Sequence, residues 1–147
     1  MRLRVLKVLA LGALVVSGSV VATPPASAAP ASGTVSCSTL SGSGTTNTAT
    51  LSGCPRRATG GSGRLSGFTP NAGTVTWADH ATLSYTDTAT GQGPGICTAT
   101  QTKVEISGAV TASTTRAIPK GSTVSMVICV DNTTFGLTNA PGTAVQF

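Results

Sequence analysis

The clearest alternation of hydrophobic and polar positions lies in residues 73–86. Apolar or small residues alternate there with threonine and serine, as is typical of strands with one buried face. A three-residue loop at 78–80 would place Val75 opposite Leu83 and keep the apolar side chains on one face, whereas a two-residue loop would mix the faces. The segment therefore predicts a β-hairpin. Its polar face would carry Thr74, Thr76, Thr82, Ser84 and Thr86.

A second hairpin is indicated around the Ser-Gly-Ser-Gly sequence that begins at Ser41. One antiparallel register pairs Leu40 with Leu51 and also Cys37 with Cys54. Because side chains alternate between the two faces of a strand, the odd offset places the leucines and the cysteines on opposite faces. The shared register supports a disulfide between the two cysteines.

Short apolar or alternating runs, separated by glycine, proline and asparagine, predict the remaining strands. The expected strand segments are 35–40, 48–54, 63–68, 103–110, 123–130, 134–137 and 143–147. Segment 123–130 is apolar at most positions, so we expect it to be central. No segment after residue 28 has the spacing of an amphipathic helix. The loop 87–95, rich in glycine, is expected to be among the least ordered parts.

Eight or nine short strands without helices predict an all-β fold. We expect a β-sandwich, immunoglobulin-like or similar, with a closed β-barrel as the alternative. Large aliphatic residues are few, so disulfides should stabilise a thin core. In this interpretation residues 34–147 form a single all-β domain that follows a flexible N-terminus at 29–33.

Residues 1–28 have the pattern of a secretory signal peptide. Basic residues precede an apolar stretch, which is followed by the small-residue cleavage site Ala26-Ser27-Ala28. The apolar stretch is about 15 residues long, whereas a helix needs roughly 20 to cross the hydrocarbon core of a membrane. We therefore expect a secreted, extracellular protein that does not insert into the membrane after the signal is cleaved.

Removal of the signal peptide changes the charge balance. The whole chain has a formal net charge of +5, and the mature part retains six basic and four acidic residues, which leaves +2. This small excess does not indicate nucleic-acid binding. Arg56, Arg57 and Arg64 form the only basic cluster, and we interpret it as a solvated loop.

Four cysteines in an exported chain indicate a disulfide framework. No C-x-x-C pair is present and the single histidine is distant in sequence, so a zinc site is disfavoured and no metal site is predicted. We predict the bridges Cys37–Cys54 and Cys97–Cys129, because each joins cysteines that follow one another in sequence and closes a local loop of a β-rich chain.

The residues that could support catalysis are few. His80 and Asp79 lie at the predicted hairpin tip, where both are expected to be turn residues, and no G-x-S-x-G motif accompanies them. Asp131-Asn132 is not followed by the carboxylate that a calcium loop needs, which favours a plain turn. The sequence therefore predicts no catalytic residues, no cofactor and a protein that is not an enzyme.

Aromatic side chains are expected to pack rather than to bind. Trp77 and Tyr85 share the apolar face of their hairpin, and Phe135 and Phe147 are expected to be core or edge residues. The threonine-rich face is interpreted as a solvated sheet surface. Its alternative role is to bind a polymer, a cell wall or another protein.

Several motifs together resemble an uncharacterised family of small secreted actinobacterial proteins. They are Cys37-Ser-Thr-Leu40, Leu51-Ser-Gly-Cys54, Gly73-Thr-Val-Thr-Trp77, Ile118-Pro-Lys-Gly121, Ile128-Cys-Val-Asp131 and Ala140-Pro-Gly-Thr-Ala-Val-Gln-Phe147. This resemblance implies export and a β fold only. The ending Pro141–Phe147 is also similar to that of neocarzinostatin-type apoproteins, immunoglobulin-like sandwiches that carry an enediyne chromophore. The wide cysteine spacing departs from the short cysteine loops of those proteins.

These observations favour a secreted, non-enzymatic protein that binds a partner or acts as a structural component outside the cell. The partner is not identified; a cell wall, a protein and a small ligand are the candidates. One alternative is a carrier of a small apolar ligand, and the other is a protease inhibitor that presents Arg56 or Arg116 on a loop.

Overall fold

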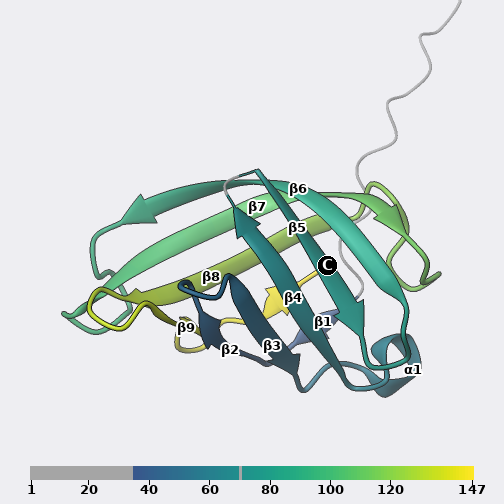
Figure 1. Cartoon of the computed structure of the whole chain (residues 1–147), viewed down its shortest axis with the longest axis horizontal. Helices are drawn as coiled ribbons and strands as arrows, with labels where there is room; N and C mark the ends of the chain where they lie inside the picture. The colour runs from purple at the N-terminus through teal and green to yellow at the C-terminus, as the bar shows by residue number, and fades with distance from the viewer. Residues whose placement is uncertain (1–34, 70) are drawn as a thin grey trace, which may run out of the picture.

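The computed structural model describes residues 35–69 and 71–147 (Figure 1). The expected signal peptide at 1–28 and the N-terminus at 29–33 lie outside the described residues. Within the described part, the chain forms ten strands and one short helix. The strands are β1 (Ser36–Cys37), β2 (Thr39–Ser43), β3 (Thr48–Ser52), β4 (Ser62–Thr69), β5 (Ala72–Trp77), β6 (Thr82–Gln92), β7 (Gln101–Ser113), β8 (Thr123–Asp131), β9 (Gly136–Asn139) and β10 (Val145–Gln146), and the helix is α1 (Arg56–Thr59).

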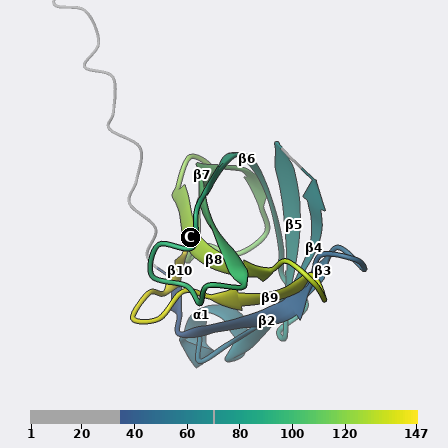
Figure 2. The same ribbon diagram turned by 90° about the vertical axis from the view of Figure 1, so that its left-hand side faces the viewer.

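The strands form one antiparallel sheet that closes on itself. From β8 the sheet runs through β7, β6, β5, β4, β3 and β2 to β9, which pairs again with β8. Thr138 of β9 therefore has a partner on both sides, Ser41 of β2 and Cys129 of β8. Seen from one end, the strands form a ring (Figure 2). β10 joins β8 at Ser125, and β1 pairs with β10.

The fold is thus an eight-stranded closed β-barrel, with β1 and β10 as an added ribbon. The expected sandwich was wrong, and its alternative, the closed barrel, is confirmed. Alternation of buried and exposed residues is the same in both architectures, and the pairing of β8 with β9 decides between them.

The hairpin of β5 and β6 has the predicted register. Val75 lies opposite Leu83, and the backbone N–H of Trp77 donates to the carbonyl of Ala81 at 2.8 Å. His80 has a φ of 68°, so the three-residue connection includes one left-handed residue. Apolar side chains of both strands point into the barrel.

The first hairpin differs from the prediction in one respect. Leu40 does pair with Leu51, but a bend at Ser38 separates β1 from β2, and Cys37 pairs with Val145 of β10. This bend turns the chain, so Cys37 and Leu40 are both fully buried. The expectation that the cysteines and leucines lie on opposite faces was therefore wrong.

Both predicted disulfides are present. Cys37 is bonded to Cys54 and Cys97 to Cys129, with Cα–Cα distances of 4.2 and 5.7 Å. The first bridge joins β1 to the segment before α1. The second joins the β6–β7 loop to the central strand β8, so each loop segment is fixed to a strand.

β6 and β7 are longer than their sequence suggests. The segment 87–95 was predicted to be a loop, but β6 continues to Gln92 because cross-strand pairing extends from Asp87, opposite Gly108, to Gln92, opposite Lys103. This prediction was wrong for residues 87–92. Glycine has a low intrinsic preference for strands, and here the ladder to β7 overrides it.

One turn of helix, α1, lies between β3 and β4, where no helix was expected. Pro55 precedes it and Gly60, with a φ of 72°, ends it. Proline at the start and a left-handed glycine at the end are the usual terminators of a short helix.

The lumen of the barrel is filled by side chains. Phe147 packs edge-on against Trp77 and Tyr85, with ring centroids 5.4 and 6.4 Å apart. All three side chains are at most 2% exposed, which confirms their predicted core positions. Phe135 is 54% exposed, so its predicted packing role was wrong; it lies in the β8–β9 turn with a φ of 56°.

Segment 123–130 is central, as predicted. β8 pairs with β7, β9 and β10. Its residues Val124, Met126 and Ile128 are buried in the lumen, and Val127 is half-buried on the outer side.

Candidate binding surface

A row of hydroxyl-bearing residues crosses the outer face of six neighbouring strands. Each residue of this first row is the register partner of the next. From β9 through β2, β3, β4 and β5 to β6, the row consists of Thr138, Ser41, Thr50, Arg64, Thr76 and Thr82. All six are exposed, and five of them carry a hydroxyl group.

A second row lies two residues further along each strand. It consists of Gly136, Ser43, Thr48, Ser66, Thr74 and Ser84, from β9 to β6. Neighbouring strands are about 4.8 Å apart, and two residues along a strand span roughly 6.7 Å. The two rows therefore place hydroxyl groups on a nearly regular grid.

All five hydroxyl groups of the first row are available to a ligand. Within the described part of the chain, no hydrogen bond uses the side-chain hydroxyl of Ser41, Thr50, Thr76, Thr82 or Thr138. Solvent or a bound molecule must satisfy these donors and acceptors.

Arg64 is the only charged residue in the two rows, and no ion pair involves it within the described residues. Two shallow hollows, of about 290 and 240 Å³, share Thr50 and Arg64 in their lining. The first extends over β2 and β3, and the second over β4 and β5 to Ala78. The guanidinium group therefore lies between two hollows lined mainly by small and hydroxyl-bearing residues.

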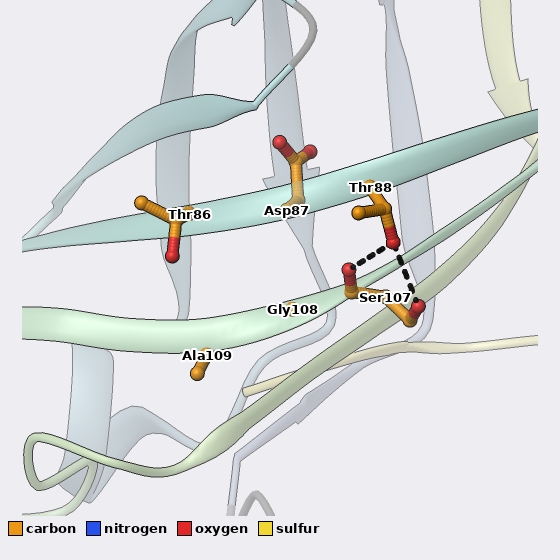
Figure 3. Close-up of a pocket in the computed structure, with 6 residues that line it drawn as sticks. All are labelled: Thr86, Asp87, Thr88, Ser107, Gly108 and Ala109. Carbon is orange, nitrogen blue, oxygen red and sulfur yellow. Dashed lines mark hydrogen bonds between the residues drawn. The ribbon is translucent and has the colours of Figure 1, made fainter.

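Two further hollows continue this surface over β5, β6 and β7. One, of about 380 Å³, lies over Ser66, Thr74 and Ser84 of the second row. The other, of about 480 Å³, is lined by Thr86, Asp87, Thr88, Ser107, Gly108 and Ala109 (Figure 3). In that hollow the Thr88 hydroxyl donates to the carbonyl oxygen of Ser107 at 3.3 Å.

Two glycines on the inner face lie opposite large aromatic side chains. A Cβ atom at Gly63 would lie 2.6 Å from Cε3 of Trp77, and a Cβ at Gly73 would collide with the Tyr85 hydroxyl. The large aromatic side chains thus occupy the space in front of glycines on neighbouring strands. The two glycines thus leave room in the lumen for the rings of Trp77 and Tyr85, their register partners.

Two buried polar groups adjoin this surface from the inside. The hydroxyl of Tyr85 and Oδ1 of Asp87 are buried without a hydrogen-bond partner, and Asp87 is only 9% exposed. In Figure 3 the Asp87 carboxylate points away from the side chains of Thr86 and Thr88. The carboxylate therefore lies on the inner side of the sheet. The backbone N–H of Asp87 donates to the carbonyl of Asn71, in the β4–β5 turn, at 3.2 Å.

Burial raises the pKa of both groups. Removal from water disfavours the charged form of the Asp87 carboxylate and raises its pKa, while the N–H groups of Asn71 and Asp87 partly counteract this effect. The pKa of Tyr85 is raised chiefly by burial and further by the nearby Asp87 charge. Nothing in the sequence pattern marks Asp87, because it occupies a glycine-rich segment that predicts a loop.

The structure places the residues that were weighed for catalysis and metal binding in turns. Oδ1 of Asp79 accepts from the backbone N–H of Ala81 at 3.0 Å, and His80 is exposed beside it. Oδ1 of Asp131 accepts from the backbone N–H groups of Thr133 and Thr134, which lowers the pKa of this exposed carboxyl. Asp79 and His80 are turn residues, as predicted. Asp131 ends β8, and its carboxylate caps the turn that follows.

The remaining predicted residues are dispersed. Arg56 and Arg57 lie on α1 and Arg64 on β4, whereas Arg116 is exposed in the β7–β8 connection. All four cysteines are in disulfides. Among residues 35–69 and 71–147, no group of three or more His, Cys, Asp or Glu side chains could hold a metal ion. The same residues include no helix long and apolar enough to cross a membrane.

Comparison with known proteins gives no further assignment. No family model, no curated protein and no solved structure matches the chain. The hydroxyl rows would have been found from the sequence only in part, since alternation identifies the threonine face of the 73–86 hairpin but not its neighbours across β2, β3 and β4.

Proposed function

We propose that the mature protein is a secreted, non-enzymatic binding protein that recognises a polysaccharide chain outside the cell. The observation that carries this proposal is the pair of hydroxyl rows on the outer face of β2 to β6, in which Arg64 is the only charged residue. Two disulfides are typical of proteins from an oxidising, extracellular environment and support this location.

The low charge of the surface is unusual for one that meets only water. Charged residues make up 9% of the chain, compared with roughly 25% in an average globular protein. A sheet face exposed only to solvent commonly carries lysine and glutamate. Rows of serine and threonine instead offer many neutral donors and acceptors, which match the hydroxyl groups of a sugar polymer.

Arg64 indicates which polysaccharides fit best. A guanidinium group binds carboxylate, phosphate and sulfate groups through paired hydrogen bonds. No carboxylate of the two rows competes for it, so an acidic substituent on the polymer could occupy the hollows on either side. We therefore propose an acidic polysaccharide as the preferred ligand.

Aromatic platforms do not contribute, since Trp77 and Tyr85 are buried. Each sugar unit is then held by hydrogen bonds alone, which are individually weak in water. Useful affinity requires contact along several strands, so binding should increase with the length of the polymer.

The test is binding of the mature protein to soluble acidic and neutral polysaccharides of graded length, measured by affinity electrophoresis and calorimetry. Replacing Thr50 and Thr76 together with valine keeps strand-forming side chains but removes two hydroxyls. This double variant and the single variant Arg64→Gln are measured separately and combined. The combined variant should bind at least tenfold more weakly. Valine at two exposed threonines outside the rows and outside β6, Thr98 and Thr133, provides the matched control.

The proposal would be contradicted by binding that is equal for all variants, or by no binding to any polymer. Loss of binding for Thr50→Val/Thr76→Val with full binding for Arg64→Gln would retain the polysaccharide but overturn the preference for acidic chains. Circular dichroism and thermal unfolding of each variant verify that the barrel is intact.

A further inference from the structure

Among residues 35–69 and 71–147, the second half of β6 is paired on one side only. β5 begins at Ala72, and its last residue pair with β6 is Gly73 opposite Tyr85. One further bond, from the Asp87 N–H to the carbonyl of Asn71, ends this contact. Residues 88–92 pair with β7 alone, and we refer to their other side as the free edge. In Figure 1 this part of β6 runs along the upper outline of the molecule, beyond β5.

Backbone groups at the free edge are available for pairing. Successive residues of a strand direct their N–H and C=O groups to opposite sides. Because Asp87 directs its N–H toward Asn71, the groups of Ala89 and Gly91 point to the same, unpaired side. Residues 88–92 are all exposed, and space beside Gly91 is open for at least 4 Å where a Cβ would be.

Within the part of the chain that the structure describes, the free edge has none of the usual features that prevent strand addition. Edges are commonly protected by lysine, by proline, by a bulge or by a covering loop. The sequence of the free edge is Thr-Ala-Thr-Gly-Gln, without charge or proline, and the bulge of β6 lies earlier, between Ser84 and Tyr85. Asp87 does not protect the edge, because its side chain is buried on the inner side of the sheet.

We propose that the free edge pairs with the free edge of a second copy of this chain. The two strands would be antiparallel and related by a twofold axis at Thr90, so that Ala89 lies opposite Gly91 of the partner subunit. Each such pair exchanges two backbone hydrogen bonds, giving four in total. The sheet then continues from β8, β7 and β6 of one copy into those of the other.

Side chains and charges favour the second copy as the occupant. On the outer face, Thr90 meets the same residue of the other copy and Thr88 meets Gln92, which are polar pairs that can form hydrogen bonds. On the outer face the nearest charges are Lys103 and Glu105 on β7, and their side chains are paired with each other at 2.8 Å. The carboxylate of Asp87, which precedes the free edge, lies on the inner face. Twofold pairing therefore brings no unbalanced like charges together.

The expected complex is a weak dimer, because four hydrogen bonds and small side chains bury little apolar surface. The test is sedimentation equilibrium of the mature protein from micromolar to millimolar concentration. Amide NMR shifts over the same range should change most at Ala89 and Gly91. This proposal is independent of polysaccharide binding, since the free edge and the hydroxyl rows use different residues.

Gly91→Pro removes the edge N–H without removing a bond of the β6–β7 ladder, and it should weaken dimerisation at least tenfold. Gly91→Ala is the matched control, because it retains the N–H and its Cβ meets no neighbouring atom. It should dimerise as the parent does.

Thr90→Cys gives a second test. Residues directly opposite in a non-hydrogen-bonded pair have Cα atoms about 4.5 Å apart, a distance compatible with a disulfide. This variant should form a covalent dimer on mild oxidation, whereas cysteine at exposed Thr138 should not. A monomer at all concentrations, or equal dimerisation and cross-linking in variants and controls, would overturn the proposal.

Discussion

The body of the barrel and the free half of β6 show two different ways of stabilising a strand. In β4 and β5 the inner residues are buried aromatic, aliphatic or glycine positions, and both edges of each strand are paired. Residues 88–92 are exposed on both faces and are held by β7 on one side. Packing therefore stabilises the body, whereas backbone pairing and the nearby Cys97–Cys129 bridge stabilise the projecting half of β6 and β7.

The difference teaches where variation is tolerated. Residues of the body are restricted by the contents of the lumen, because each inner side chain contacts those of several strands. Residues of the projecting segment face solvent and are restricted only by strand formation. A surface that is functional but variable in sequence can exist there without cost to the core.

The largest predicted effect is the loss of a lumen side chain. Trp77→Ala should lower the free energy of unfolding by about 3–5 kcal/mol, since it leaves a cavity between Phe147 and the strands around it. Ile96 lies in the loop between β6 and β7, at the end of the projecting half of these strands. Ile96→Ala should change the free energy of unfolding by less than about 0.5 kcal/mol, because Ile96 is 55% exposed. Urea unfolding measures both free energies. It is followed by far-UV circular dichroism, so that the loss of the tryptophan does not change the signal. Equal losses would show that the two regions are not stabilised differently.

Removal of the Cys97–Cys129 bridge should have the next largest effect. Alanine at both positions should cost about 3–4 kcal/mol by loss of chain constraint. Hydrogen exchange should accelerate first at amides of residues 89–104, while β4 and β5 stay protected. The double variant Cys37→Ala/Cys54→Ala is the comparison, and it should accelerate exchange in the body instead. The same exchange pattern in both variants would show that the two bridges do not stabilise different regions.

Asp87→Asn should have a smaller effect, in the stabilising direction. Burial raises the folded-state pKa of Asp87 above its unfolded value, so its contribution to stability is fully present below about pH 4 and is lost as the pH rises through the raised folded pKa. At pH 7 the variant should be more stable than the parent protein, because an amide is less costly to bury than a charge.

The gain from Asp87→Asn should shrink toward pH 3, and thermal unfolding across this pH range measures it. Tyr85→Phe, which removes the neighbouring buried hydroxyl, is the control and should give no such pH dependence below pH 8. A gain that is equal at pH 3 and pH 7 would contradict the assignment to ionisation.

Local patterns predicted the pairs but not the closure. The register of Val75 with Leu83 and both disulfides follow from alternation and cysteine placement, because these depend on neighbouring segments. Closure depends on β9 reaching β2 and β8 at once, which involves residues almost 100 positions apart in sequence. Sandwich and barrel share the same alternation, so the wrong choice between them has a physical cause.

The candidate surface was predictable in part for the same reason. Thr74 and Thr76 were assigned to the polar face of their hairpin, but their alignment with Thr50 and Arg64 requires the register of three strands. The continuation of β6 past Asp87 depends on pairing with β7 across Gly108, which the glycine content of the segment conceals. Phe135 was expected in the core or at an edge because it is apolar. It is exposed because it lies in the turn that Asp131 stabilises.

Closure of the barrel has a consequence for ligand selection that sugar chemistry alone would not supply. Six adjacent strands cover most of the circumference of an eight-stranded barrel, so the hydroxyl rows are wrapped around a cylinder. A stiff, crystalline fibre is flat and touches a cylinder along a narrow line, whereas a pliant single chain can bend around it. For the proposed function, the protein would thus sort polymers by their mechanical flexibility, binding dissolved chains in preference to ordered fibres of the same composition.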